Sequence, residues 1–216
     1  MIVAKQKPLE EIKEMIEDYK KVLVLGCGTC TAICLAGGDK EVAVLTSSLR
    51  LADKVSGKDR TFKEHTVERQ CEWEFLDELK EQVKEIDAIL SLGCGVGVQT
   101  TSERFSEIPV LPGLDTLFMG MPQQERVWVE QCSGCGNCIL DQTGGICPIT
   151  RCTKGLLNGP CGGTNDGKCE VDPEKDCAWT LIYQRLEKQG KLDLMRQYYP
   201  PRNFQAVVRP GKVTIE

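Results

Sequence analysis

The chain has 216 residues, a net charge of -5 at neutral pH and a pI of about 5.2. This acidic balance argues against a nucleic-acid-binding protein, because such proteins carry a basic surface that meets the phosphates. Hydrophobic residues make up 41% of the chain, which is enough for a core and excludes a disordered protein. The length fits one large domain or two small ones.

The first half of the chain alternates helical and strand patterns. Leu9, Ile12 and Ile16 recur at helical spacing and predict a helix over residues 8–19. The apolar run at 22–25 predicts a strand that is buried on both faces. Further helices are predicted at 29–35, 47–55 and 73–86, and further strands at 42–45, 62–67, 88–92 and 108–111. This alternation predicts an α/β domain over residues 1–115, with a Rossmann-like parallel sheet.

From about residue 116 the pattern changes, and Gly, Cys, Asn and Pro dominate. Helices are predicted only at 178–189 and 191–199, followed by an extended tail. Apolar residues are too few here to hold the segment together by burial alone, so bound metal would have to supply the missing stabilisation. We therefore expect an irregular, cysteine-rich, metal-stabilised domain over residues 116–216.

Cysteine is the unusual component, with 13 in the chain and eight of them within residues 132–177. The N-terminal sequence MIVAKQKPLEEIKEM contains no apolar secretory segment, and the count is odd. Clustered cysteines outside an oxidising compartment indicate metal ligands rather than disulfides. The longest uncharged run, 22–38, is interrupted by glycines, so we expect no membrane span and a cytoplasmic protein.

The strongest motif is Cys132-x2-Cys135-x2-Cys138, which is followed by Cys147-Pro148. Bacterial ferredoxins share this opening and the Cys-Pro ending, although their gap before Cys-Pro is shorter. Three thiolates at this spacing suit three corners of a [4Fe-4S] cluster. In two-cluster ferredoxins the Cys-Pro thiolate belongs to the other cluster, and by that analogy Cys177 would be the fourth ligand here.

Two pairings of these eight cysteines remain open from the sequence. In the ferredoxin-like pairing, the second site consists of Cys147, Cys152, Cys161 and Cys169. In the sequential pairing, the first site ends at Cys147 and the second consists of Cys152, Cys161, Cys169 and Cys177. Either site could instead bind zinc, which also uses four cysteines with short spacings.

A second group of cysteines follows the predicted strands of the first half. Cys27, Cys30 and Cys34 come directly after the first buried strand, within a Gly-Cys-Gly turn and the helix behind it. A second Gly-Cys-Gly turn, with Cys94 at its centre, follows the strand at 88–92. The carboxyl ends of parallel strands form one functional edge, so we expect Cys94 to be the fourth ligand of a third site. Cys71 is the alternative fourth ligand.

The stretch LLNGPCGGTNDGKCEVDPEKDCAW at residues 156–179 resembles the cysteine-rich C-terminal domain of methylenetetrahydrofolate reductase. With the C-x2-C-x2-C opening, the resemblance covers about residues 115–212. In anaerobic bacteria, acetogens of the Wood-Ljungdahl pathway above all, this domain is found on a small iron–sulfur- or zinc-binding subunit that accompanies the flavin-bearing reductase.

The resemblance implies that the chain passes electrons, from ferredoxin or another donor, to the FMN of a catalytic partner, which reduces methylenetetrahydrofolate to methyltetrahydrofolate. Two or three [4Fe-4S] clusters are expected, with zinc as an option at one site. The sequence itself offers no set of catalytic residues and is too short for a flavin barrel of about 250 residues. Two alternatives are a structural zinc scaffold for the same reductase and, with less support, a corrinoid- or methyl-transfer-linked binding module.

Overall fold

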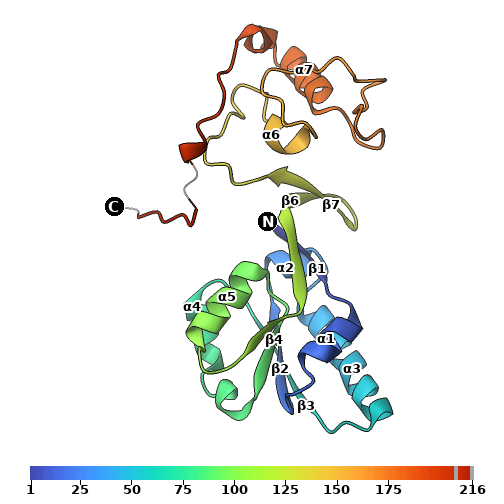
Figure 1. Ribbon diagram of the computed structural model, residues 1–216, viewed down its shortest axis with the longest axis vertical. Coiled ribbons are helices and arrows are strands. Elements are labelled where there is room, and N and C mark those ends of the chain that lie inside the picture. Colours follow the sequence, from blue (N-terminus) through green and yellow to red (C-terminus); the bar gives the residue numbers. More distant parts are fainter. Residues whose placement is uncertain (207–208, 215–216) are drawn as a thin grey trace. The chain divides into compact units, whose positions relative to one another are not determined.

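The computed structural model describes residues 1–206 and 209–214, without the side chain of Phe204. The chain forms two compact units, Met1–Val129 and Glu130–Glu216 (Figure 1). The sequence pattern placed the change after residue 115. The first unit extends further because a strand beyond that position pairs with the start of the chain.

The first unit is built on a four-stranded parallel sheet. Its strands, in spatial order, are β3 (Thr61–Val67), β2 (Lys21–Cys27), β4 (Ala88–Ser91) and β5 (Val110–Pro112). The predicted α/β class with a parallel sheet is confirmed. Because β2 pairs with β3 on one side and β4 on the other, the order of strand addition reverses between β2 and β4. Ligands of open α/β sheets bind beside such a switch point.

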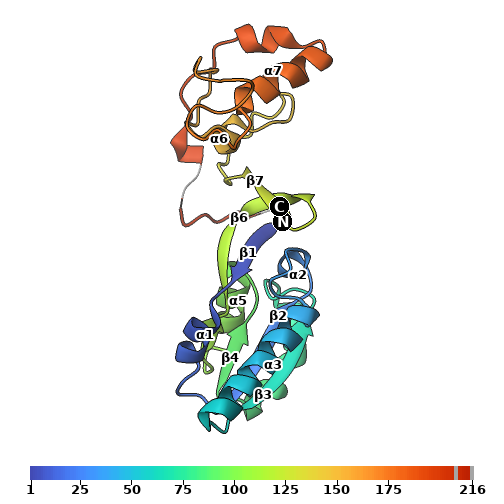
Figure 2. The same ribbon diagram turned by 90° about the vertical axis from the view of Figure 1, so that its right-hand side faces the viewer.

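Helices cover both faces of this sheet (Figures 1 and 2). One face is covered by α1 (Leu9–Met15) and α3 (Asp39–Ser56), and the other by α4 (Trp73–Leu76), η1 (Asp77–Leu79), η2 (Gln82–Glu85) and α5 (Gly95–Arg104). In β2, Val22 and Val24 belong to the first core and Leu23 and Leu25 to the second. The unbroken apolar run in this strand therefore reflects burial on both sides, as predicted.

Two predictions for the first unit are wrong in detail. The strand predicted at 42–45 is part of α3, where Val42, Leu45 and Leu49 are buried at helical spacing. The carboxylate of Glu41 accepts a hydrogen bond from the N–H of Gly38 (3.0 Å), which caps the start of this helix. The helix predicted at 73–86 is instead divided among the short segments α4, η1 and η2.

A second sheet was not anticipated from the sequence. It consists of β1 (Ile2–Gln6), β6 (Leu114–Gln124) and β7 (Val127–Cys132), in that spatial order. β1 and β6 are antiparallel, with Val3 opposite Phe118. The boundary between the two units falls within β7.

The second unit has little regular structure. It contains α6 (Pro148–Arg151), α7 (Ala178–Lys188), η3 (Leu192–Arg196) and η4 (Phe204–Ala206). The predicted helix at 178–189 is confirmed as α7, whereas the one at 191–199 is only the 3-10 segment η3. Its core is small and centres on Trp179, Ile182 and Leu186 of α7. Among the described residues of the whole chain, no helix is long and apolar enough to cross a bilayer.

Candidate metal centres

The two Gly-Cys-Gly turns follow neighbouring strands of the parallel sheet. Cys27 is the last residue of β2, and Cys94 precedes α5 in the loop after β4. β2 and β4 pair directly, with Leu25 opposite Ser91. Both cysteines therefore lie at the carboxyl edge of the sheet, beside its switch point, as the sequence led us to expect.

Cys71 lies at the same edge. Its side chain is exposed, yet partial desolvation raises the pKa of its thiol, and repulsion from Cys27 and from Cys94 raises this pKa further. Gln70, the residue before Cys71, hydrogen-bonds to Leu25 of β2 and to Ser91 of β4, which places Cys71 at this edge. The segment before Cys71 also touches the first turn, because the thiol of Cys27 donates to the carbonyl of Glu68 (3.9 Å).

Cys30 and Cys34 lie at opposite ends of the short helix α2 (Cys30–Ile33). Cys30 begins this helix and is half-buried. Cys34 follows it and is 6% exposed, within the core on the α1 and α3 face. Its thiol donates to the carbonyl oxygens of Ala4 and Thr31 (both 3.5 Å). Burial raises the pKa of this thiol and so opposes formation of the thiolate that a metal requires.

In the second unit, a cavity of about 210 Å³ is lined by the four cysteines of the C-x2-C-x2-C motif and its Cys-Pro ending. They are Cys132, Cys135, Cys138 and Cys147. The remaining lining includes Ile139, Leu140 and Ile149. Cys177 does not line this cavity and is buried at the start of α7. The arrangement corresponds to the sequential pairing rather than the ferredoxin-like one.

The loop that carries these thiols also brings a backbone N–H group to sulfur. Gly134 has a positive φ of 63°, a conformation that favours glycine, and its N–H donates to the thiol sulfur of Cys132 (3.4 Å). Hydrogen bonds of this kind stabilise a thiolate and tune the potential of an iron–sulfur centre. The donor set and the cavity thus fit a thiolate-bound cluster.

The other four cysteines lie on loops that are linked to one another. Cys169 donates from its thiol to Thr153, which follows Cys152 (3.7 Å). Thr164, three residues after Cys161, donates from its hydroxyl to the carbonyl of Lys168, next to Cys169 (3.0 Å). The N–H of Cys177 donates to the carbonyl of Gly167 (2.7 Å), so the segments that carry all four cysteines are neighbours.

Two of these thiols are in surroundings that favour ionisation. Backbone N–H groups, that of Val171 first, and the hydroxyl of Thr153 lower the pKa of Cys169. Burial acts to raise the pKa of Cys177, but hydrogen bonds from Thr180, Thr164 and the backbone of Trp179 outweigh it and lower the pKa. Metal ligation requires thiolates, so this second set also fits a metal centre chemically.

All thirteen cysteines are free thiols. Within residues 1–206 and 209–214, no three Cys, His, Asp or Glu side chains form a group that could hold a single metal ion. Whether the three predicted sites bind metal thus stays a prediction.

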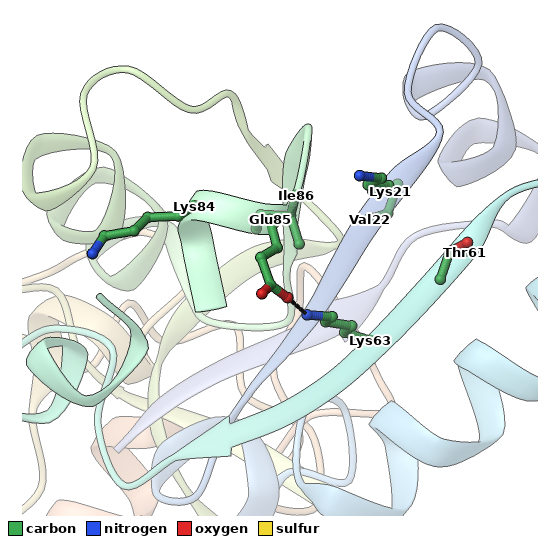
Figure 3. A pocket seen from close by; sticks show the side chains of 7 residues that line it. All are labelled: Lys21, Val22, Thr61, Lys63, Lys84, Glu85 and Ile86. Carbon is green, nitrogen blue, oxygen red and sulfur yellow. Dashed lines mark hydrogen bonds and ion pairs between the residues drawn. The ribbon is translucent and has the colours of Figure 1, made fainter. Parts of the chain in front are cut away.

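A separate cavity of about 470 Å³ lies at the opposite edge of the parallel sheet, where the strands begin. Lys21 and Thr61, the first residues of β2 and β3, line it together with Lys63 and Lys84 (Figure 3). Lys63 forms an ion pair with Glu85, which lowers the pKa of that carboxyl. The lining contains no cysteine, so this cavity is distinct from the candidate metal centres.

The geometry of the second unit can be set beside known families. Residues 111–205 match the family described as Methylene-tetrahydrofolate reductase C terminal. This part of the chain is similar to that C-terminal domain. The matched segment includes all eight cysteines from Cys132 to Cys177, whereas the other five cysteines precede it. Neither the curated proteins nor the solved structures yielded a match to this chain.

Structure also reveals one residue of the first unit that the sequence analysis overlooked. Gln70 precedes Cys71 and is fully buried between the ends of β2 and β4. A single glutamine next to a cysteine gives no signal of this role in the sequence, because both of its partners are distant along the chain.

Proposed function

We propose that this chain is the electron-transfer subunit of a methylenetetrahydrofolate reductase complex. It would accept electrons from ferredoxin or another low-potential donor and deliver them to the FMN of a catalytic partner. That partner would reduce methylenetetrahydrofolate to methyltetrahydrofolate. The chain itself would hold two or three [4Fe-4S] clusters and carry out no chemistry on the folate.

The observation that carries the proposal is the cavity formed by Cys132, Cys135, Cys138 and Cys147 within the segment that matches the reductase family. Four thiols around one space are the ligand set of a [4Fe-4S] cluster. When bound, such a cluster supplies one-electron transfer. The protein would provide the thiolates, the N–H of Gly134 toward sulfur and the apolar wall that limits water.

The fold of the first unit supports a proposal in which this chain carries electrons and a partner performs catalysis. Its parallel sheet has four strands and is open, whereas a reductase barrel closes eight strands around a core. In the proposed complex, the flavin and the folate would therefore be bound by a partner, and the units described here would carry electrons.

The competing function is a zinc scaffold that stabilises the reductase without carrying electrons. The second set, Cys152, Cys161, Cys169 and Cys177, provides four cysteines on poorly structured loops, which is also the setting of structural zinc. Iron, acid-labile sulfide and zinc should be measured on chain purified without oxygen. About eight to twelve irons with equal sulfide would support the electron carrier. Zinc without iron would exclude it.

Replacement of one cluster ligand tests the function directly. In the reconstituted complex, Cys135→Ala should remove about four irons per chain and abolish ferredoxin-driven folate reduction. Reduction by artificial dyes that reach the flavin should continue, because the partner is unchanged. Ser133→Ala changes the same loop without removing a thiol and should retain both activities. Ferredoxin-driven activity that survives the loss of iron in Cys135→Ala would refute the proposal.

A further inference from the structure

Gln70 links the two strand ends that flank the switch point of the parallel sheet. Its side chain is 0% exposed. The amide nitrogen donates to the carbonyl oxygens of Leu25 (2.8 Å) and Gly26 (3.1 Å), at the end of β2. The amide oxygen accepts from the hydroxyl of Ser91 (2.5 Å), the last residue of β4. One side chain thus fastens the loop after β3 to both neighbouring strands.

The loop after β4 passes close to the side chain of Gln70. A Cβ at Gly93, next to Cys94, would lie 2.5 Å from the amide oxygen of Gln70. Such a separation is too short for a real contact, so glycine is needed for the loop after β4 to pass this close. The loop of Cys94 is therefore packed directly against the residue that precedes Cys71.

Cys71 follows Gln70 directly, so it is held at the switch point. Cys27 reaches the same loop through its contact with Glu68. Cys27, Cys71 and Cys94 therefore come from three separate strand ends that lie at one edge of the sheet. Cys30 begins α2, three residues after Cys27, and its half-buried thiol is the candidate for a fourth ligand.

Cys34 is placed differently. It is buried in the core with Val3 and Ala4, and its hydrogen bonds go to backbone carbonyls of β1 and α2. Rotating this sulfur toward the edge would break both bonds and leave a gap in the core. Its spacing in the sequence fits a ligand, but its surroundings are those of a structural cysteine.

We infer that Cys27, Cys30, Cys71 and Cys94 form the ligand set of the N-terminal site, that this site takes a [4Fe-4S] cluster, and that Cys34 is a core residue. The inference rests on the iron–sulfur content proposed above and goes beyond it by assigning the ligands. The ligand set expected from the sequence contained Cys34, and the inferred set contains Cys71 in its place. Four thiolates supply the complete set for one cluster.

Matched alanine variants of the two cysteines test the exchange. In anaerobically purified full-length chain, Cys71→Ala should lose about four irons and four sulfides, together with the electron paramagnetic resonance signal of one cluster. Cys34→Ala should keep the wild-type iron, sulfide and signal. Full retention of iron in Cys71→Ala, or loss confined to Cys34→Ala, would overturn the inference.

Alkylation of the wild-type chain provides a second measurement that does not depend on how a variant folds. Cys71 is exposed, so without a bound cluster it should react quickly with iodoacetamide in the native protein. In the iron-loaded chain it should be protected, and it should become reactive once the iron is removed. Cys34 should stay unreactive in both states because it is buried. Rapid labelling of Cys71 in iron-loaded chain would overturn the assignment.

The outcomes separate this inference from the proposed function. Suppose that Cys71 is protected and that its variant loses about four irons, but that ferredoxin cannot drive the complex of the wild-type chain. This result would support the ligand set and refute the electron-transfer role. Ferredoxin-driven activity with Cys71 freely labelled would do the reverse. A wild-type chain without iron or sulfide would overturn both.

Discussion

The two units of this chain are stabilised in different ways. The parallel sheet of the first unit is covered on both faces, and two apolar clusters fill the space between sheet and helices. In the second unit the buried cluster comprises Cys177, Trp179, Ile182 and Leu186, and most of the remaining backbone is loop. The apolar core of the second unit is thus much the smaller of the two. Under the proposed function, metal bound by its cysteines would supply the stabilisation that burial gives to the first unit.

The largest expected effect is that of metal removal. Oxidative removal of iron with a chelator should unfold the second unit, since loss of a structural metal removes on the order of 10 kcal/mol. Hydrogen exchange of the α7 amides should then accelerate by more than about a hundred-fold. Amides of β4 should change little, because an apolar core protects them. Unchanged protection of α7 after complete metal loss would show that the second unit folds without metal.

A core truncation in the first unit should have an intermediate effect. Leu90, in β4, is 0% exposed, so Leu90→Ala should lower the free energy of unfolding of this unit by about 2–5 kcal/mol. The loss, measured by urea denaturation, should be equal with and without metal. Val44→Ala removes an exposed side chain of α3 and should cost less than about 0.5 kcal/mol. A metal-dependent loss in Leu90→Ala would contradict the contrast between the units.

The smallest effect concerns the charges that join α5 to η1. Arg104 and then Lys80 hydrogen-bond to Asp77 and lower the pKa of its carboxyl below 3.8. A lowered pKa stabilises the folded state above the ordinary pKa, and this contribution disappears as the pH falls through the lowered value. Asp77→Asn should therefore destabilise the first unit slightly at pH 7, in urea denaturation, and not in strong acid. Glu103→Gln, an exposed change on α5, serves as the control. A pH-independent difference for Asp77→Asn would contradict this explanation.

Local sequence patterns were sufficient where neighbouring residues determine the structure. The apolar run of β2 and the glycines after it located the carboxyl edge, and the spacing of Cys132, Cys135 and Cys138 located a loop whose thiols line one cavity. The strand predicted at 42–45 was wrong because four apolar residues fit either a strand or one side of a helix. The capping interaction of Glu41 with Gly38 was the available signal for a helix.

Long-range contacts accounted for the rest. β1 pairs with β6 across more than a hundred residues. Gly120 and Pro122 lie within β6 and are residues that are unfavourable in strands. The placement of Cys34 depends on the carbonyl of Ala4 in β1, and that of Cys71 depends on Gln70 and two distant strands. Spacing along the chain carries no information about such partners.

The limits of the matched family segment also have a practical consequence. The segment begins at residue 111, inside β5, yet β5 pairs with β4 and β6 pairs with β1. A protein fragment that begins at residue 111 would contain part of β5, the edge strand of the parallel sheet, and all of β6, the central strand of the second sheet. Both would lack their partners β4 and β1, and unpaired strand edges promote aggregation. The border of the family match and the border between the two compact units therefore differ, and a fragment meant to contain the whole first unit should extend through β7, which the boundary after residue 129 divides.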